Sequence, residues 1–322
     1  MKIVVTGSLG YIGKPLTEEL VKNGHSVTVI SSQTERKKEI EALRAKAAIG
    51  TVEDVNFITD TFTGADAVYC MLAAPGNSFT NPSFKPIEYS TKIANNYVKA
   101  IQQSGVKRIV YLSSIGAHTD KGNGLLALHY YAEKTLNQLP PDVSITFMRP
   151  VGFYKNLNQF AEFVKGKGFL GAFLALRTYG LLGMISGRRG VIMSNYGQDD
   201  MSLWASSIDI ASAITEELET PSTGRKVRYV TSDELTCNEV ARILGEAVGK
   251  PYLKWGVISS KQLLSGMKQN GMPSQIAEGL VEMNESIRSG KLYEDYNRNK
   301  PKLGKVKMTD YAKEFAKIYN KK

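Results

Sequence analysis

The feature that most constrains this chain lies in its first thirteen residues, where a β-branched run leads directly into a glycine-rich turn. Ile3-Val4-Val5 is followed by Thr6-Gly-x-x-Gly-x-x-Gly13. This order predicts the first strand, phosphate loop and first helix of a dinucleotide-binding unit. Gly7 permits the sharp turn, Gly10 lets backbone N–H groups approach a pyrophosphate, and Gly13 lets the helix lie close against the strand.

The residues after the turn support this interpretation. Leu16 and Leu20 stand at i and i+4, as on the buried face of a helix, and residues 26–30 have the pattern of a second strand. The alternative is a glycine turn selected only for packing, because 29 glycines produce spaced triplets by chance. We expect the whole loop to contact a nucleotide through Gly7, Ser8, Leu9, Gly10, Tyr11, Ile12 and Gly13.

The first half of the chain alternates short apolar runs with helical periods. This pattern predicts an α/β fold, namely a doubly wound parallel Rossmann sheet with a smaller, mainly helical C-terminal region. Strands are expected at residues 2–6, 26–31, 46–49, 67–72, 108–113 and 144–148. Helices are expected at about 11–23, 35–44, 55–60, 87–104 and 128–138.

The alternation of short apolar runs with helical periods ends after Arg149. We expect a nucleotide-binding domain over residues 1–155, to which a strand near 226–231 returns, and a substrate-covering, mainly helical region over 156–225 and 232–322. Within that region, residues 165–200 are predicted to form loops and short helices. Thr236 and Glu239 form a capping-box pattern at the start of a helix that extends to residue 248. Further helices are predicted at 259–268, 273–287 and 309–320.

The charge, the apolar segments and the few cysteines and histidines limit which partners and which cellular compartment are expected. The chain enters a strand at once, and its apolar segments 169–176 and 179–185 are parted by Arg177 and too short to span a bilayer. A soluble, cytoplasmic protein without a membrane partner is therefore expected. The net charge of +10 has no nucleic-acid recognition motif beside it, which favours a solvated basic surface and no nucleic-acid partner. The two cysteines and three histidines show no metal-site spacing, and both cysteines are expected to be buried.

The end of the second strand bears on the choice of cofactor. Enzymes that prefer NAD place an acidic residue there to bind the ribose 2′-hydroxyl, whereas this chain has Ser31, Ser32 and Gln33, followed by the basic triplet Arg36-Lys37-Lys38. Hydroxyls and an arginine suit a 2′-phosphate, so NADP(H) is expected to be preferred over NAD(H). The alternative is that the triplet decorates an exposed helix start, and Glu35 in the same turn supports it.

Candidate catalytic residues follow the fifth strand. That strand ends in Ser113 and Ser114, and Tyr130 and Lys134 come later at i and i+4, on one face of a predicted helix. A lysine ammonium favours a phenolate, and a serine hydroxyl can hold a carbonyl, so Tyr130, Lys134 and Ser114 are the predicted catalytic residues, with Tyr130 as general acid. Tyr296 and Lys300 have the same spacing. Tyr130 and Lys134 are favoured only because they follow a strand that ends in serines, where a Rossmann fold binds its ligand.

Several motifs together resemble the NmrA-like atypical short-chain dehydrogenases/reductases, which are related to the extended sugar-nucleotide epimerases. They are Thr6-Gly-x-x-Gly-x-x-Gly13, Val110-Tyr-Leu-Ser-Ser114, the Lys134 helix, Met148-Arg-Pro-x-x-Phe-x-x-Asn156 and Ser207-Ile-Asp-Ile-Ala211. The resemblance covers residues 1 to about 250 and implies a Rossmann domain with a C-terminal region closing over the nicotinamide. Members of that family include NADPH-dependent reductases, quinone oxidoreductases and proteins that bind NADP only to sense it. The resemblance therefore implies one of these functions.

The resemblance assigns roles to individual residues. Gly7, Gly10 and Gly13 would hold the pyrophosphate, and Lys134 the nicotinamide ribose. Further expected contacts are Leu72, Ala73 and Ala74 with the adenosine, and Ser113, Ser114, Pro150 and Phe153 with the nicotinamide. Two positions depart from the family pattern. Tyr130 is absent from many members, and Gly50-Thr51 replaces a common Gly-Asp, which leaves Thr51 as the residue near the adenine.

The leading hypothesis is an NADP(H)-dependent oxidoreductase that transfers hydride between the nicotinamide and a small carbonyl, quinone or enone, apolar or aromatic in character. One alternative is a regulatory protein that senses NADP(H) without turnover. Another is a sugar-nucleotide epimerase or dehydratase that keeps NAD(H) tightly bound. The sequence favours no particular oligomeric state and no metal.

Overall fold

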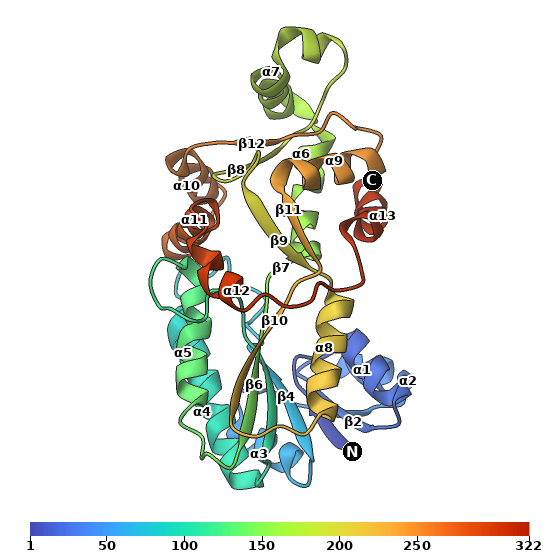
Figure 1. The fold of residues 1–322 in the computed structure, drawn as a ribbon, viewed down its shortest axis with the longest axis vertical. Helices are drawn as coiled ribbons and strands as arrows, with labels where there is room; N and C mark the ends of the chain where they lie inside the picture. The colour runs from blue at the N-terminus through green and yellow to red at the C-terminus, as the bar shows by residue number, and fades with distance from the viewer. Residues whose placement is uncertain (322) are drawn as a thin grey trace.

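A seven-stranded parallel sheet forms the base of the molecule (Figure 1). The computed structural model describes residues 1–321, apart from the side chain of Leu170. The strand order is β10-β6-β5-β4-β1-β2-β3. The strands are β1 (Lys2–Val5), β2 (Ser26–Ser31), β3 (Lys46–Ile49), β4 (Ala67–Met71), β5 (Arg108–Leu112), β6 (Ser144–Pro150) and β10 (Arg225–Val230). The predicted doubly wound parallel sheet is confirmed, and β10 forms where a further strand was expected.

Helices cover both faces of this sheet, which is why its strands are apolar on both sides. Ile3 and Val5 of β1 belong to the core under one set of helices, whereas Val4 belongs to the core on the opposite face. The first face carries α1 (Gly13–Lys22) and α8 (Ser207–Glu219), and the second carries α3 (Val55–Phe62), α4 (Pro86–Ser104) and α5 (Ala127–Leu136). The short helix α2 (Lys37–Ala42) connects β2 and β3.

The remaining elements build a smaller region beyond the carboxyl ends of the strands (Figure 1). Its helices are α6 (Ala161–Lys165), α7 (Gly168–Ile185), α9 (Cys237–Ala247), α10 (Ser260–Gln269), α11 (Ser274–Arg288), α12 (Glu294–Arg298) and α13 (Met308–Tyr319). Its strands are β7 (Gly152–Phe153), β8 (Ile192–Ser194), β9 (Met201–Ala205), β11 (Asp233–Thr236) and β12 (Trp255–Val257). These strands form two small sheets, β11-β9-β7 and β12-β8, which were not expected from the sequence because two to five residues carry too little alternation.

Short sequence patterns in the second half of the chain predict where its helices begin and which side chains they bury. The capping box of Thr236 and Glu239 is present at the start of α9, and Val240 and Leu244 are buried as their spacing predicts. Both cysteines, Cys70 and Cys237, are free and buried, as expected. Within residues 165–200 the longest helical segment is α7, which breaks at Gly180, where φ is +69°. Among residues 1–321, no helix is both long and apolar enough to cross a bilayer.

Candidate cofactor and active site

The glycine loop follows β1 at the carboxyl end of the sheet. Gly7 adopts φ +87°, and a Cβ at this position would lie 2.1 Å from the Met71 sulfur at the end of β4. The conformation therefore favours glycine, and any other residue would also displace the Met71 side chain. The neighbouring Thr6 hydroxyl accepts a hydrogen bond from the Met71 N–H at 3.0 Å, which ties the start of the loop to β4.

Gly10 and Gly13 serve different purposes. A Cβ on Gly10 would meet only the Gly7 carbonyl oxygen, at an ordinary 3.5 Å, so packing of the protein itself does not require glycine there. A Cβ on Gly13 would lie 2.0 Å from the Ser8 carbonyl oxygen. This contact corrects the expectation that Gly13 packs against the strand, because the close approach is within the loop. Gly10 thus remains the position at which an approaching ligand explains the glycine.

The start of α1 is open to an anion. Its N-cap residue, Ile12, offers no side-chain acceptor, and its first turn contains no acidic residue. The Lys14 N–H donates to the Gly10 carbonyl at 3.1 Å and Pro15 has no N–H, so an anion would meet the N–H groups of residues 9–13, at the positive end of the helix dipole. A pyrophosphate is the ligand that such a helix start binds behind a glycine loop.

The end of β2 lies beside this loop. The Ser8 hydroxyl donates to the Ser31 hydroxyl at 2.9 Å, and the Gln33 N–H donates to the same Ser31 oxygen at 3.2 Å. The Arg36 guanidinium pairs with Glu39 at 2.5 Å, and this hydrogen bond lowers the pKa of Glu39. Arg36 must therefore exchange Glu39 for a 2′-phosphate if it binds one. This competition was not expected from the sequence, although Glu39 lies only three residues away.

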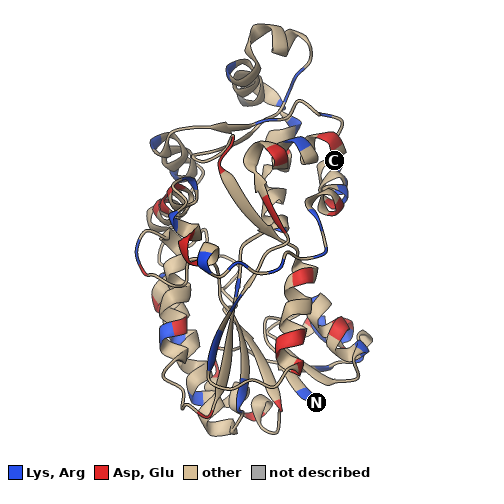
Figure 2. Cartoon of the chain, in the orientation of Figure 1, with Lys and Arg blue, Asp and Glu red and all other residues tan. Residues whose placement is uncertain are grey.

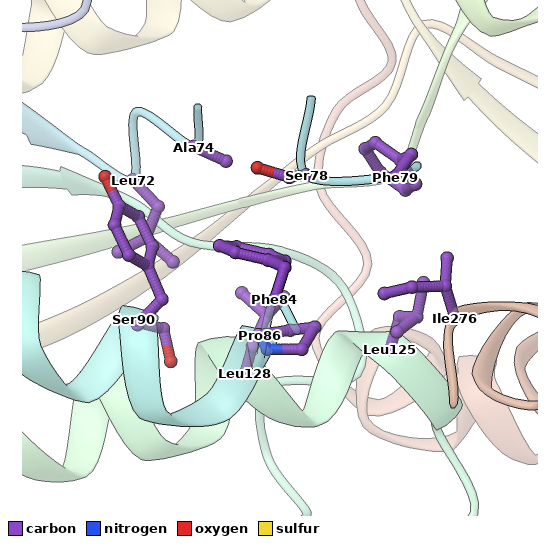
Figure 3. Close-up of a pocket in the computed structure, with 11 residues that line it drawn as sticks. Leu72, Ala74, Ser78, Phe79, Phe84, Pro86, Ser90, Leu125, Leu128 and Ile276 are labelled. Carbon is purple, nitrogen blue, oxygen red and sulfur yellow. The ribbon is translucent and has the colours of Figure 1, made fainter. Parts of the chain in front are cut away.

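An apolar cavity of about 80 Å³ lies beyond the end of β4 (Figure 3). It is partly open and is lined by the segment after β4, the start of α4, the turn before α5, the start of α5, and α11. Phe84 and Pro86 lie between Leu72 on one side and Leu125 and Ile276 on the other (Figure 3). The lining residues are Leu72, Ala74, Ser78, Phe79, Phe84, Pro86, Tyr89, Ser90, Leu125, Leu128 and Ile276. The Ala73 carbonyl accepts from the Tyr89 hydroxyl at 2.8 Å, which fixes the segment that carries Leu72 and Ala74.

The end of β5 is joined to α5 by a buried ionic network. The Ser113 hydroxyl donates to the Glu133 carboxylate at 2.5 Å, and Glu133 receives two hydrogen bonds from Arg149 at 2.6 and 2.9 Å. Arg149 also pairs with Asp295 of α12 at 3.1 Å. The side chains of Glu133 and Arg149 are only 7% and 8% exposed. Burial lowers the pKa of Arg149, but its hydrogen bonds to Glu133 more than compensate, and the net shift is upward.

Glu133 defines the face of α5 that meets the strand ends. Tyr130 lies about 60° around the helix from it and Lys134 about 100°, both on the side away from the buried Ala132 and Leu136. Lys134 is exposed and Tyr130 partly buried, with its ring packed edge-on against Tyr131 at 5.3 Å. Within residues 1–321, neither the Tyr130 hydroxyl nor the Lys134 ammonium has a side-chain partner. Their catalytic roles stay predictions.

One turn before Glu133, on the same face, lies His129. Its ring Nδ1 is buried without a hydrogen-bond partner among the described residues. Burial lowers the pKa of His129 to about 4, so the imidazole is neutral at physiological pH. His129 was not among the predicted site residues, because the histidines were considered only for metal spacing. Its i, i+4 relation to a buried glutamate is the signal that was available.

The other predicted contacts lie around the same sheet edge. Pro150 ends β6 in the core, Phe153 is half-buried in β7, and Ser114 is half-buried just beyond β5. Thr51 is exposed after β3, where a Cβ on Gly50 would lie 2.5 Å from the Phe57 ring. No ligand contact is established for these residues, so their roles stay predictions. Among residues 1–321, no group of three His, Cys, Asp or Glu side chains is arranged to hold a metal ion.

A family model described as NAD(P)H-binding matches residues 7–167, the stretch that carries the glycine loop, β2 to β6 and α5. The chain belongs to this NAD(P)H-binding family. The resemblance to the NmrA-like atypical short-chain dehydrogenases/reductases is thereby confirmed.

Two solved structures share the whole fold of this NAD(P)H-binding protein. Triphenylmethane reductase of Citrobacter sp. superposes with a TM-score of 0.70 at 18% identity, covering 98% of this chain and 100% of the reductase. An NADPH-dependent quinone oxidoreductase of Escherichia coli, in complex with NADPH, gives a TM-score of 0.67 at 17% identity, covering 97% and 99%. At these identities the likeness establishes the fold alone.

Curated relatives match over shorter stretches. A 4-hydroxy-2-methyl-3-oxo-4-farnesyl-3,4-dihydroquinoline-1-oxide ketoreductase of Stigmatella aurantiaca is 25% identical over 114 residues, 35% of this chain and 34% of the relative. A UDP-glucose 4-epimerase of Klebsiella pneumoniae is 28% identical over 135 residues, 38% of this chain and 94% of the relative. The chain thus spans between a third and a half of the ketoreductase and the next two relatives, at 34%, 46% and 35%.

Proposed function

We propose that this protein is an NADP(H)-dependent oxidoreductase that reduces an apolar or aromatic carbonyl, quinone or enone. The observation that carries the proposal is the apolar cavity lined by Phe84, Leu125 and Ile276, which lies beyond the end of β4, the strand next to β1. A sugar nucleotide would bury hydroxyl groups against this lining at a substantial cost, whereas an aromatic ring would not. The cavity therefore favours a reductase of apolar substrates over an epimerase.

The residues present fit a bound dinucleotide. Backbone N–H groups around Gly10 and the open start of α1 would hold the pyrophosphate, and Ser31 and Arg36 would receive a 2′-phosphate. When bound, NADPH supplies hydride to the substrate carbon, and a proton is then required at the substrate oxygen. An apolar lining around the substrate would hold few water molecules, which would strengthen a hydrogen bond made to that oxygen.

Two residues of α5 are candidates for that hydrogen bond. The spacing to Lys134 favours Tyr130, whereas the direction of the helix face favours His129. We propose His129, because Glu133 points this face toward the strand ends and the imidazole has a buried, unpartnered nitrogen. A neutral imidazole can polarise a carbonyl by donating a hydrogen bond, as the preorganised donors of other enzymes do.

The two candidates are separated by substitution. We expect His129→Phe to lower turnover of an aromatic ketone about a hundredfold with little change in NADPH affinity, the usual scale for losing one preorganised donor. Tyr130→Phe serves as the matched control and should stay within about threefold of the parent. Steady-state kinetics and calorimetry measure both quantities. If turnover falls about a hundredfold in Tyr130→Phe and not in His129→Phe, the hydrogen-bond donor is Tyr130, as the sequence predicts.

The pH profile gives a further readout of His129. Because its pKa is lowered to about 4, the ring stays neutral across the range in which an ordinary histidine titrates, near pH 6.5. We therefore expect turnover to show no histidine-like change between about pH 5.5 and 8.

Cofactor choice is tested by affinity. We expect NADPH to bind at least about tenfold more tightly than NADH, which is about 1.4 kcal/mol and within reach of one charge-assisted phosphate contact. Arg36→Ala should abolish most of this preference, and Glu39→Gln should increase it by releasing Arg36. Lys22→Ala, at the opposite end of α1, removes the same charge away from the site and should leave the ratio unchanged. Equal affinities measured by calorimetry would contradict the assignment.

The reaction class is tested with a panel of quinones and aromatic ketones. NADPH oxidation by members of this panel is the expected result, and ketones must be included because quinones can accept hydride without a proton donor. Tight NADPH binding without oxidation by any member would favour a sensing protein. NAD(H) retained through purification would favour an epimerase.

A further inference from the structure

The segment α7 stands off the end of the molecule opposite the Rossmann sheet (Figure 1). It consists of two helical pieces that meet at Gly180, where φ is +69° and ψ 179°. Its surface is unusually apolar for one that faces solvent. The exposed large side chains are Phe169 (90%), Phe173 (52%), Leu176 (42%), Leu181 (60%), Leu182 (84%) and Ile185 (71%).

These side chains form an apolar patch around one short segment and are not scattered over the molecule. All six lie within residues 169–185, and Phe163 in the preceding helix is also 45% exposed. A helix that is apolar around its circumference is typical of burial in a protein core or in lipid. Ala175 is fully buried, but the larger apolar groups of this segment remain uncovered. An uncovered apolar cluster of this size is typical of a surface that binds a partner.

The charge around the patch is of one sign. From Phe163 to Gln198 the sequence contains five basic residues and no aspartate or glutamate. Lys165 pairs with Glu162 at 2.6 Å, but Lys167, Arg177, Arg188 and Arg189 are exposed. Figure 2 shows basic and no acidic positions on α7 and the segments that connect it. A partner that is apolar inside and negative at its surface matches this combination.

The dimensions exclude a spanning role for α7. The break at Gly180 divides the eighteen residues of α7, whereas a helical span needs about twenty continuous residues. Attachment to a bilayer surface scales with the apolar area buried at the headgroup level and with the attraction of basic residues to anionic lipids, and α7 with its basic border supplies both.

We propose that α7 docks this protein on the surface of an anionic membrane. Phe169, Leu182 and Ile185 insert among the lipids, while Lys167, Arg188 and Arg189 face the lipid phosphates. This docking revises the expectation of no membrane partner and does not depend on the proposed reductase activity. A second copy of the chain is a poorer occupant, because pairing two such patches would bring the cationic borders together.

The test uses the full chain and vesicles of phosphatidylcholine with or without phosphatidylglycerol at about one third, measured by flotation. We expect binding to the anionic vesicles, at least about tenfold weaker binding to the neutral ones, and release by high salt. The double variant Phe169→Glu/Leu182→Glu should lose binding. Lys167→Gln/Arg189→Gln should lower binding to anionic vesicles about tenfold or more.

The matched control is Val227→Glu, because Val227 is 43% exposed on β10, away from α7. It should bind vesicles as the parent does. Each variant should keep the thermal unfolding midpoint of the parent, since the substituted side chains are exposed. Equal binding by the Phe169→Glu/Leu182→Glu variant, or no binding to anionic vesicles, would overturn the proposal. A parent dimer that this variant dissociates, without vesicle binding, would also overturn it and assign α7 to a second copy.

Discussion

We expect Gly10→Val to lower NADPH affinity at least about a hundredfold while the chain still folds, because the added side chain would occupy the path of the pyrophosphate. The fold tolerates the substitution for a geometric reason. Gly10 is not among the residues with positive φ, and a Cβ there meets only the Gly7 carbonyl oxygen at 3.5 Å. Calorimetry gives the affinity, and thermal unfolding gives the integrity of the fold.

Two other glycines serve as controls for this prediction. A Cβ added to Gly266 of α10 would meet open space, and this residue lies in the C-terminal region, so Gly266→Val should leave NADPH affinity unchanged. Gly13→Val should lower affinity and stability together, because its Cβ would lie 2.0 Å from the Ser8 carbonyl oxygen. Unchanged affinity in Gly10→Val would mean that the loop does not approach a pyrophosphate.

The second large effect concerns stability. Glu133→Leu is expected to lower the free energy of unfolding by about 3–5 kcal/mol, because it leaves the buried Arg149 guanidinium without its main partner. Asp295 pairs with the same guanidinium from a more exposed position and compensates only in part. Urea unfolding measures the loss. The slope of the denaturant dependence should stay constant if the native surface is unchanged.

A double variant shows whether the loss comes from an unpaired charge. Glu133→Leu/Arg149→Met removes both charges and should recover much of the stability, since replacing a buried pair by apolar side chains is often close to neutral. The exposed pair of Lys107 and Asp142, at 2.6 Å, is the control, and Asp142→Ala should have little effect because solvent screens it. A small loss in Glu133→Leu would contradict the prediction that the network stabilises the junction of β5, β6 and α5.

The sequence predicted the elements whose signals are local. The β-branched run of β1, the glycine spacing and the apolar positions of α1 each involve neighbouring residues, and the structure forms the strand, loop and helix that they indicate. The capping box at Thr236 is equally local, because its two partners are three residues apart. Periodicity also predicted a parallel sheet, since buried apolar runs separated by helices favour parallel strands.

Signals that depend on residues far apart were missed. The small sheets join strands such as β9 and β11, which lie almost thirty residues apart and are too short to show alternation. The network around Glu133 joins Arg149 to Asp295, 146 residues later in the chain. Gly13 was expected to approach the strand, but it approaches Ser8 of the loop. The spacing of the glycines predicts a close contact but does not identify the residue that is contacted.

Helix α5 separates most clearly what the sequence determines from what the tertiary structure decides. The sequence by itself determined that Tyr130 and Lys134 share one face and that His129 and Glu133 share another, because the helical repeat fixes these angles. Only the tertiary structure decided which face meets the sheet, through the contact of Glu133 with Ser113 and Arg149. Likewise, the sequence determined that α7 is apolar, whereas its exposure depends on how the rest of the chain packs. The rotation and covering of a helix are settled by long-range contacts, which the local pattern does not contain.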